Sequence, residues 1–184
     1  MRPNMITRYA AASLAAAMTL GAGAANMRAA TGAQTLIYAV YDGQDTASQV
    51  FKSIREAQGP QTGERIESYA IVSKDAKGKV TVLDQRKHDA AVGAVLGGVI
   101  GLVGGPAGVA AGAAAGGAVG FLTGNAVGIP RDKVESMRNS LTPNSSALVV
   151  VLEDMWVQDM ERSLRQLKAR EVIASHIASG QKTQ

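Results

Sequence analysis

Residues 147–152 read ALVVVL, a continuously apolar run that predicts a strand covered on both faces or central in its sheet. Glu153 and Asp154 end this run. An amphipathic helix is expected next, from apolar residues at helical spacing: Val157, Met160, Leu164 and Leu167. EVIASHI at 171–177 has the composition of another strand, and a helix beginning at Pro130 is predicted before the run.

The first half of the chain has a similar order. TLIYAVY at 35–41 predicts a strand, which the turn residues Asp42-Gly43 close. A helix is expected to follow, with one apolar face made by Ala47, Val50, Phe51 and Ile54. RIESYAIVS at 65–73 and the residues at 80–83 predict two strands joined by a hairpin loop.

Two βαβ halves predict an α+β fold of the ferredoxin-like, split βαβ kind, with an antiparallel sheet and helices on one face. A glycine-rich block lies between the halves, so we expect it to be an insertion whose two ends return to the same domain. The predicted segments are a signal-like or anchor segment at 1–33, a first βαββ half at 34–88, a glycine-zipper helical hairpin at 89–129, a second (α)βαβ half at 130–178 and a tail at 179–184.

Glycine recurs at every fourth position within the block, and no residue from Ala90 to Pro130 is charged. Each glycine costs a helix roughly 1 kcal/mol relative to alanine, so a ladder at helical spacing favours close helix packing of the small-xxx-small kind, which is typical of membranes. The glycines expected to pack helices together and to drive homo-oligomerisation are Gly93, Gly97, Gly101, Gly108, Gly112, Gly116, Gly120 and Gly124.

Gly104-Gly105-Pro106 is expected to break the block into two helical arms. The first arm, 89–103, is rich in Val, Leu and Ile and is expected to face lipid. The second arm, 107–127, is mostly Ala and Gly, would be about 31 Å long, and is expected to pack against other helices. The hairpin is predicted to dip into one leaflet or to cross the bilayer obliquely. The alternatives are a soluble Ala/Gly hairpin, packed on the sheet or paired with a second copy, and a disordered linker.

Four cations frame the block and are expected to meet anionic lipid headgroups at the membrane interface: Arg86, Lys87, Arg131 and Lys133. Asp84, Asp89 and Asp132 lie among them, so a solvated surface is the alternative.

The segment before the first acidic residue, Asp42, has the layout of a secretory signal. Arg2 and Arg8 precede an uncharged run from Tyr9 to Met27, and Ala22-Gly23-Ala24 offers a cleavage site. The alternatives are an uncleaved, weak membrane anchor and a disordered or misassigned start. We expect a membrane protein, most simply of the bacterial inner membrane, and cleavage would place the domain outside the cytoplasm.

Charge and composition exclude several classes of function. The chain has a net charge of +4, but three of its basic residues precede residue 34, and the remainder carries 16 Lys and Arg against 15 Asp and Glu. That balance gives no reason to propose a nucleic-acid partner. Cysteine is absent, so disulfides, thiol nucleophiles and thiolate metal sites are excluded.

No catalytic, cofactor-binding or metal-binding residue is predicted. The sequence has no P-loop, no Gly-x-Ser-x-Gly elbow and no dinucleotide-binding fingerprint. His176 is expected to be a satisfied edge or core histidine, and His88 has no second donor pair at metal spacing. Asp42 and Asp154 end matching strands; each is expected to cap a turn, with a paired acid–base role as the alternative.

Three stretches carry a resemblance to a known family: LIYAVYD at 36–42, KDAKGKV at 74–80 and SLTPNSSAL at 140–148. With the glycine-rich block between them, they resemble the domain of unknown function 1269 family of bacterial and archaeal predicted membrane proteins, over about 35–177. Asn144 stands where glycine is usual, and asparagine also tolerates the positive φ of such a turn. The resemblance implies membrane association and supplies no catalytic residues.

The function expected from these features is that of a non-enzymatic, self-associating membrane protein with lipid as its partner. The alternative is a soluble or periplasmic oligomeric module that binds a small ligand or a partner and uses the hairpin as a dimerisation arm.

Overall fold

The computed structural model describes residues 33–58, 66–87, 90–114 and 129–177. The chain divides into two units, Met1–Gly32 and Ala33–Gln184, and all described residues lie in the second. The signal-like segment, the tail and the end of the second glycine arm therefore lie outside the described residues, and the predictions made for them stay predictions.

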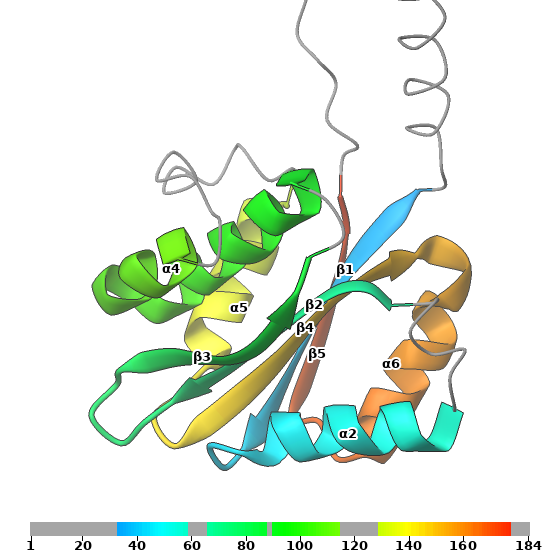
Figure 1. Ribbon diagram of the computed structural model, residues 1–184, viewed down its shortest axis with the longest axis horizontal. Coiled ribbons are helices and arrows are strands. Elements are labelled where there is room, and N and C mark those ends of the chain that lie inside the picture. Colours follow the sequence, from blue (N-terminus) through cyan, green and yellow to red (C-terminus); the bar gives the residue numbers. More distant parts are fainter. Residues whose placement is uncertain (1–32, 59–65, 88–89, 115–128, 178–184) are drawn as a thin grey trace, which may run out of the picture. The chain divides into compact units, whose positions relative to one another are not determined.

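Five antiparallel strands form one sheet in the order β3-β2-β4-β1-β5 (Figure 1). The strands are β1 Gln34–Asp42, β2 Ile66–Lys74, β3 Val80–Arg86, β4 Ser145–Glu153 and β5 Glu171–Ile177. Each was predicted from its residues, and β3 continues three residues further than expected. The run at 147–152 lies in the central strand and is fully buried, as its composition predicted.

Four helices and one short 3-10 turn are present in the described residues. They are α2 Thr46–Gln58, α4 Ala90–Ala114, α5 Arg131–Ser140, α6 Val157–Gln166 and the turn η3 Asp154–Trp156. The predicted apolar face of α2 is buried, as are Val134 and Met137 of α5 and Met160 and Leu164 of α6. Hydrophobic periodicity thus located these helices correctly.

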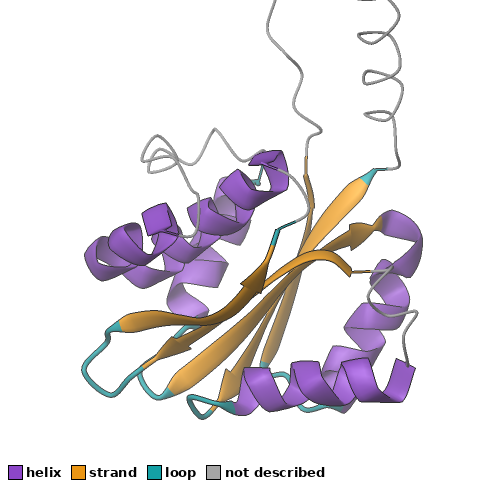
Figure 2. Cartoon of the chain, in the orientation of Figure 1, coloured by secondary structure: helices purple, strands orange, loops and turns teal. Residues whose placement is uncertain are grey.

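Helices cover both faces of the sheet (Figure 2). On one face α2 and α6 pack against Ile37, Ala39 and other residues of β1, β2 and β4. On the other face α4 and α5 pack against Leu36, Tyr38 and Val40. The prediction of helices on one face only is wrong, because β1 and β4 are apolar at consecutive positions and successive side chains point to opposite faces, so both faces need cover.

The first glycine arm covers much of the sheet face on which α5 also packs. Its large side chains are all 8% exposed or less, namely Val92, Val95, Leu96, Val99, Ile100, Leu102 and Val103. They belong to the same cluster as Leu36, Tyr38 and Val149 of the sheet. The expectation that this arm faces lipid is therefore corrected: its apolar side chains are needed to bury one face of the sheet.

The predicted break in the glycine block is confirmed at Gly105. Its backbone has φ 58° and ψ −148°, which is non-helical and interrupts α4. A helical segment continues after the break to Ala114. Among the helices of the described ranges, none is long and apolar enough to cross a membrane.

Candidate functional site

The residues predicted to pack helices or to meet lipid are distributed along the chain. Gly93 lies in the first arm, where an added Cβ would be 3.1 Å from Cδ of Lys87. Gly97 and Gly101 are buried in the same arm, and Gly108 and Gly112 follow the break. Gly116, Gly120 and Gly124 lie outside the described residues. Their role in association stays a prediction.

The four framing cations are on the surface of the αβ domain. Arg86 ends β3, Lys87 follows it and Arg131 begins α5, and all three are exposed. Lys133 is half-buried on the first turn of α5. Their headgroup role also stays a prediction.

Asp42 and Asp154 lie at opposite ends of the sheet, so the alternative of a carboxylate pair is wrong. Because β1 and β4 are antiparallel, Asp42 lies opposite Ser145, whereas Asp154 directly follows Glu153, the residue opposite Gln34. The end of each strand therefore meets the start of the other strand. The two carboxylates have different partners.

Asp42 belongs to a cluster that fastens the start of β5. Its Oδ1 accepts a hydrogen bond from the Arg170 guanidinium at 2.6 Å. The same guanidinium donates to the carbonyl of Ser140 at 2.5 Å and to Oγ1 of Thr142 at 3.2 Å. The Arg170 amide also donates to the carbonyl of Val40 at 2.7 Å. One side chain thus connects β1, the end of α5 and the start of β5, which is a structural role.

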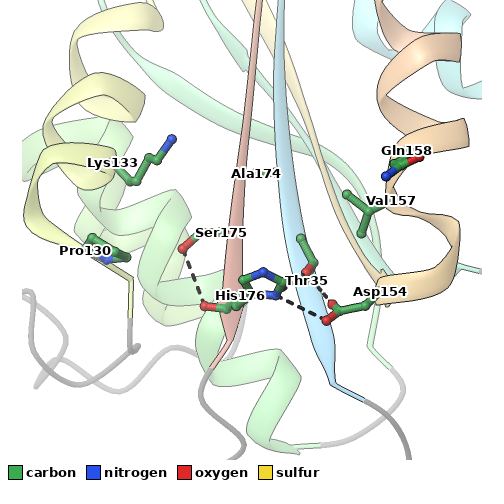
Figure 3. Close-up of a pocket in the computed structure, with 9 residues that line it drawn as sticks. All are labelled: Thr35, Pro130, Lys133, Asp154, Val157, Gln158, Ala174, Ser175 and His176. Carbon is green, nitrogen blue, oxygen red and sulfur yellow. Dashed lines mark hydrogen bonds and ion pairs between the residues drawn. The ribbon is translucent and has the colours of Figure 1, made fainter.

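Asp154 forms a second cluster at the other end of the sheet, with Thr35 and His176 (Figure 3). Thr35 and His176 are paired residues of β1 and β5, and the Asp154 amide donates to the carbonyl of Ala33 at 3.0 Å. Thr35 Oγ1 donates to Asp154 Oδ1 at 2.5 Å, and Asp154 Oδ2 lies 3.3 Å from His176 Nδ1. Nδ1 also lies 3.0 Å from Thr35 Oγ1.

This cluster does not have the geometry of a catalytic triad. Because the Thr35 hydroxyl donates its proton to Asp154, Nδ1 of His176 must be the donor toward Thr35. In a nucleophilic triad the hydroxyl and the carboxylate take opposite ring nitrogens, so that the base can accept the hydroxyl proton. Here both lie at Nδ1, and the His176 side chain is 80% exposed. The prediction of a satisfied edge histidine is confirmed.

A cavity of about 520 Å³ opens beside this cluster and reaches around the outer edge of β5, which pairs with no described strand other than β1. Pro130, which precedes α5, and Lys133 of α5 line it on one side, and Val157 and Gln158 of α6 line it on the other, as Figure 3 shows. Ala174, Ser175 and His176 of β5 lie between them. The cavity therefore follows a strand edge, and it has the volume of a ligand or side-chain site.

Metal chemistry has no support in the part of the chain that the structure describes. No group of three or more His, Cys, Asp or Glu side chains within it is arranged to hold an ion. Asp154 and His176 supply two possible donors, which already bind each other and Thr35.

Comparison with protein-family models identified one match. The model described as "Protein of unknown function (DUF1269)" matches residues 90–184, just over half of the chain. The chain belongs to the DUF1269 family. The match confirms the resemblance that SLTPNSSAL at 140–148 and the glycine-rich block predicted. The matched part of this DUF1269 protein begins with α4 and contains α5, β4, α6 and β5. Comparisons with curated proteins and with solved structures found no match.

Proposed function

We propose that this DUF1269 protein is a non-enzymatic membrane-associated protein. Its αβ domain holds the first arm of the glycine block as part of its core, and the second arm, 107–127, enters the bilayer and self-associates through its glycines. The observation that best supports this proposal is the break at Gly105, which ends the arm that is buried on the sheet. Beyond it the sequence stays uncharged to Pro130 and keeps glycine at every fourth position.

The two arms differ in what they need for burial. The first arm obtains it from the sheet and from α5. The second arm has mainly Ala and Gly, which gain little from water-driven packing but allow backbones to approach closely in lipid. Arg131 and Lys133 begin α5 directly after the block, where they would meet anionic headgroups.

We further propose that β5, β1, β4 and β2 are a ferredoxin-like sheet to which β3 is added at one edge. Support comes from the connections: α2 joins β1 to β2, α6 joins β4 to β5, and both helices pack on the same face. The first arm of the glycine block and α5 then cover the opposite face of the sheet, which the two βαβ units leave uncovered.

Membrane fractionation tests the proposed function. In cells that express the tagged chain, the full protein should stay with membranes washed in carbonate and salt, and a variant with 107–127 replaced by a Gly/Ser linker should be released. Removing 90–128 is a poor variant, because it would also remove seven buried side chains from the core. Release of both proteins would overturn the proposal.

The alternative function, a soluble partner-binding module, is favoured by the burial of the first arm and by the cavity at β5. Fractionation separates the two functions, and leucine substitutions in the second arm test association through the glycines. Gly112→Leu with Gly116→Leu should shrink the membrane oligomer, whereas Ala110→Leu with Ala114→Leu, on the opposite side of an ideal helix, should not. Equal oligomer size in both double variants would contradict association through the glycines.

A further inference from the structure

We propose that the free edge of β5 is an interface with a second copy of this chain, in which the two β5 strands pair antiparallel about Ala174. This inference rests on the sheet edge and the cavity around it. It does not rest on the entry of the second glycine arm into the bilayer, and Lys133 is the one residue that both proposals use.

The two edges of the sheet differ in their protection against pairing. At β3 the register shifts where β2 passes from Ile71 to Val72, which leaves Leu83 as an extra residue, and Asp84 and Arg86 put charges on this strand. Bulges and charges of this kind prevent edge-to-edge pairing. The edge at β3 is therefore protected.

The edge at β5 is less protected, because Glu171 at its first position is the only Asp, Glu, Lys or Arg on the strand. Its seven residues pair with β1 without a register shift, and they include no proline and no lysine. Only β1 pairs with β5 among the described strands, so alternate backbone amides and carbonyls of β5 point away from the sheet. A regular strand edge with free hydrogen-bonding groups is a template for another strand.

Charge complementarity selects a second copy as that strand. Lys133 and Glu171 lie on the same face of the sheet, the face covered by α5, but toward opposite ends of β5: Lys133 lines the cavity with Ser175, and Glu171 is the first residue of the strand. Neither has an ion pair with another described residue. Antiparallel pairing about Ala174 brings Glu171 of each copy opposite Ile177 of the other, close to its Lys133, and the symmetry makes this contact twice.

The side chains near the axis also fit. Ala174 would face its own copy, and its small side chain allows the α6 helices on either side to approach. Val172 of each copy would lie opposite His176 of the other, next to the apolar part of the cavity wall at Val157. The cavity at this edge then receives side chains of the second copy.

Disulfide trapping tests the interface, because the full chain contains no cysteine. Ala174→Cys places two thiols across the axis at a separation that a disulfide can bridge. Leu83→Cys is the matched control, since Leu83 is exposed and lies on the protected edge. Under mild oxidation the Ala174→Cys chain should give at least ten times more covalent dimer than the Leu83→Cys chain. Equal yields would overturn the proposal, as would yields that are low in both.

Charge reversal within the same cysteine chain provides a second measurement, in which a lost dimer yield must be restored by a compensating change. In the Ala174→Cys chain, Lys133→Glu should lower the dimer yield several-fold, and adding Glu171→Lys should restore it. A yield that neither change affects would overturn the pairing about Ala174. Because the trapping of Ala174→Cys reports on β5, its failure would leave the membrane fractionation result of the unsubstituted chain unchanged.

Discussion

Tyr38 and Tyr41 are three residues apart in β1, point to opposite faces of the sheet and are both fully buried. The hydroxyl of Tyr38 donates to the carbonyl of Met137 at 3.3 Å. The buried hydroxyl of Tyr41 has no hydrogen-bond partner among the described residues. Burial raises the pKa of both phenols well above the usual 10. The same residue type is therefore satisfied on one face and unsatisfied on the other.

Replacing each tyrosine with phenylalanine should change stability in opposite directions. Tyr41→Phe removes an unpaired buried hydroxyl and should raise the free energy of unfolding by up to about 1 kcal/mol. Tyr38→Phe removes a long hydrogen bond and should lower it by about 0.5–1 kcal/mol, since the Met137 carbonyl keeps its 2.9 Å bond from Ser140 Oγ. Urea unfolding of the two variants, followed by circular dichroism, measures the difference. A loss of stability in Tyr41→Phe would contradict the unsatisfied hydroxyl.

For single residues, the sequence predicted which side chains are buried better than it predicted which side chains hydrogen-bond to each other. Periodicity placed Val50, Phe51 and Met137 in the core. It gave no signal for Arg170, which joins segments up to 128 residues apart, or for Thr35, which meets Asp154 only because β1 lies between β4 and β5. The amide of Ala47, near the start of α2, is likewise bound by the distant Ser146 Oγ at 3.0 Å. Such contacts depend on strand order, which local patterns do not specify.

At the scale of single elements, turn chemistry was the most reliable signal. The turn before β4 was expected to tolerate a positive φ at Asn144, and its φ is 58°. The break in the glycine block was expected at Gly104-Gly105-Pro106 and lies at Gly105. Packing of the glycine block on the sheet was only the alternative prediction, because an uncharged Val- and Gly-rich helix has the same composition whether it meets lipid or a sheet.

Two Gly→Ala substitutions in α4 should distinguish a glycine needed for its backbone conformation from a glycine that merely lowers helix stability. Gly105 has a conformation that only glycine adopts readily, so Gly105→Ala should cost about 1–3 kcal/mol of stability. Gly93 is helical, and its added methyl would meet only the flexible Lys87 side chain, so Gly93→Ala should be neutral or stabilise by up to about 0.5 kcal/mol. Thermal unfolding of both variants tests this. Similar shifts in both would contradict a break that needs glycine.

At the scale of the whole molecule, the sheet is a central layer that both helical layers need. One face is covered by α2 and α6, which follow β1 and β4 directly in the chain. The other face depends on α4 and α5, which come from the glycine block and from the segment after it. An insertion that looks like an appendage in the sequence is thus partly a component of the core.

Stability should fall in strong alkali. Burial raises the pKa of Tyr38, Tyr41 and, together with Asp84, of Tyr69, so the folded protein holds these phenols neutral at a pH where the unfolded chain ionises them. The contribution is therefore complete below pH 10 and is lost as the pH rises above it. Urea midpoints should be flat from pH 8 to about 9.5 and decline by pH 11. The decline should be smaller in a Tyr38→Phe, Tyr41→Phe double variant. If the variant and the unsubstituted chain decline equally, ionisation of other groups causes the loss of stability.

The proposed division of the glycine block into a core arm and a membrane arm is tested most directly by hydrogen–deuterium exchange of the full chain, with and without lipid vesicles. Amides of the first arm, 92–103, should be protected to the same extent in both conditions, because they are buried on the sheet. Amides of 107–127 should gain protection when vesicles are present. Protection of 107–127 that does not change with vesicles, or protection of the first arm that requires them, would contradict this division.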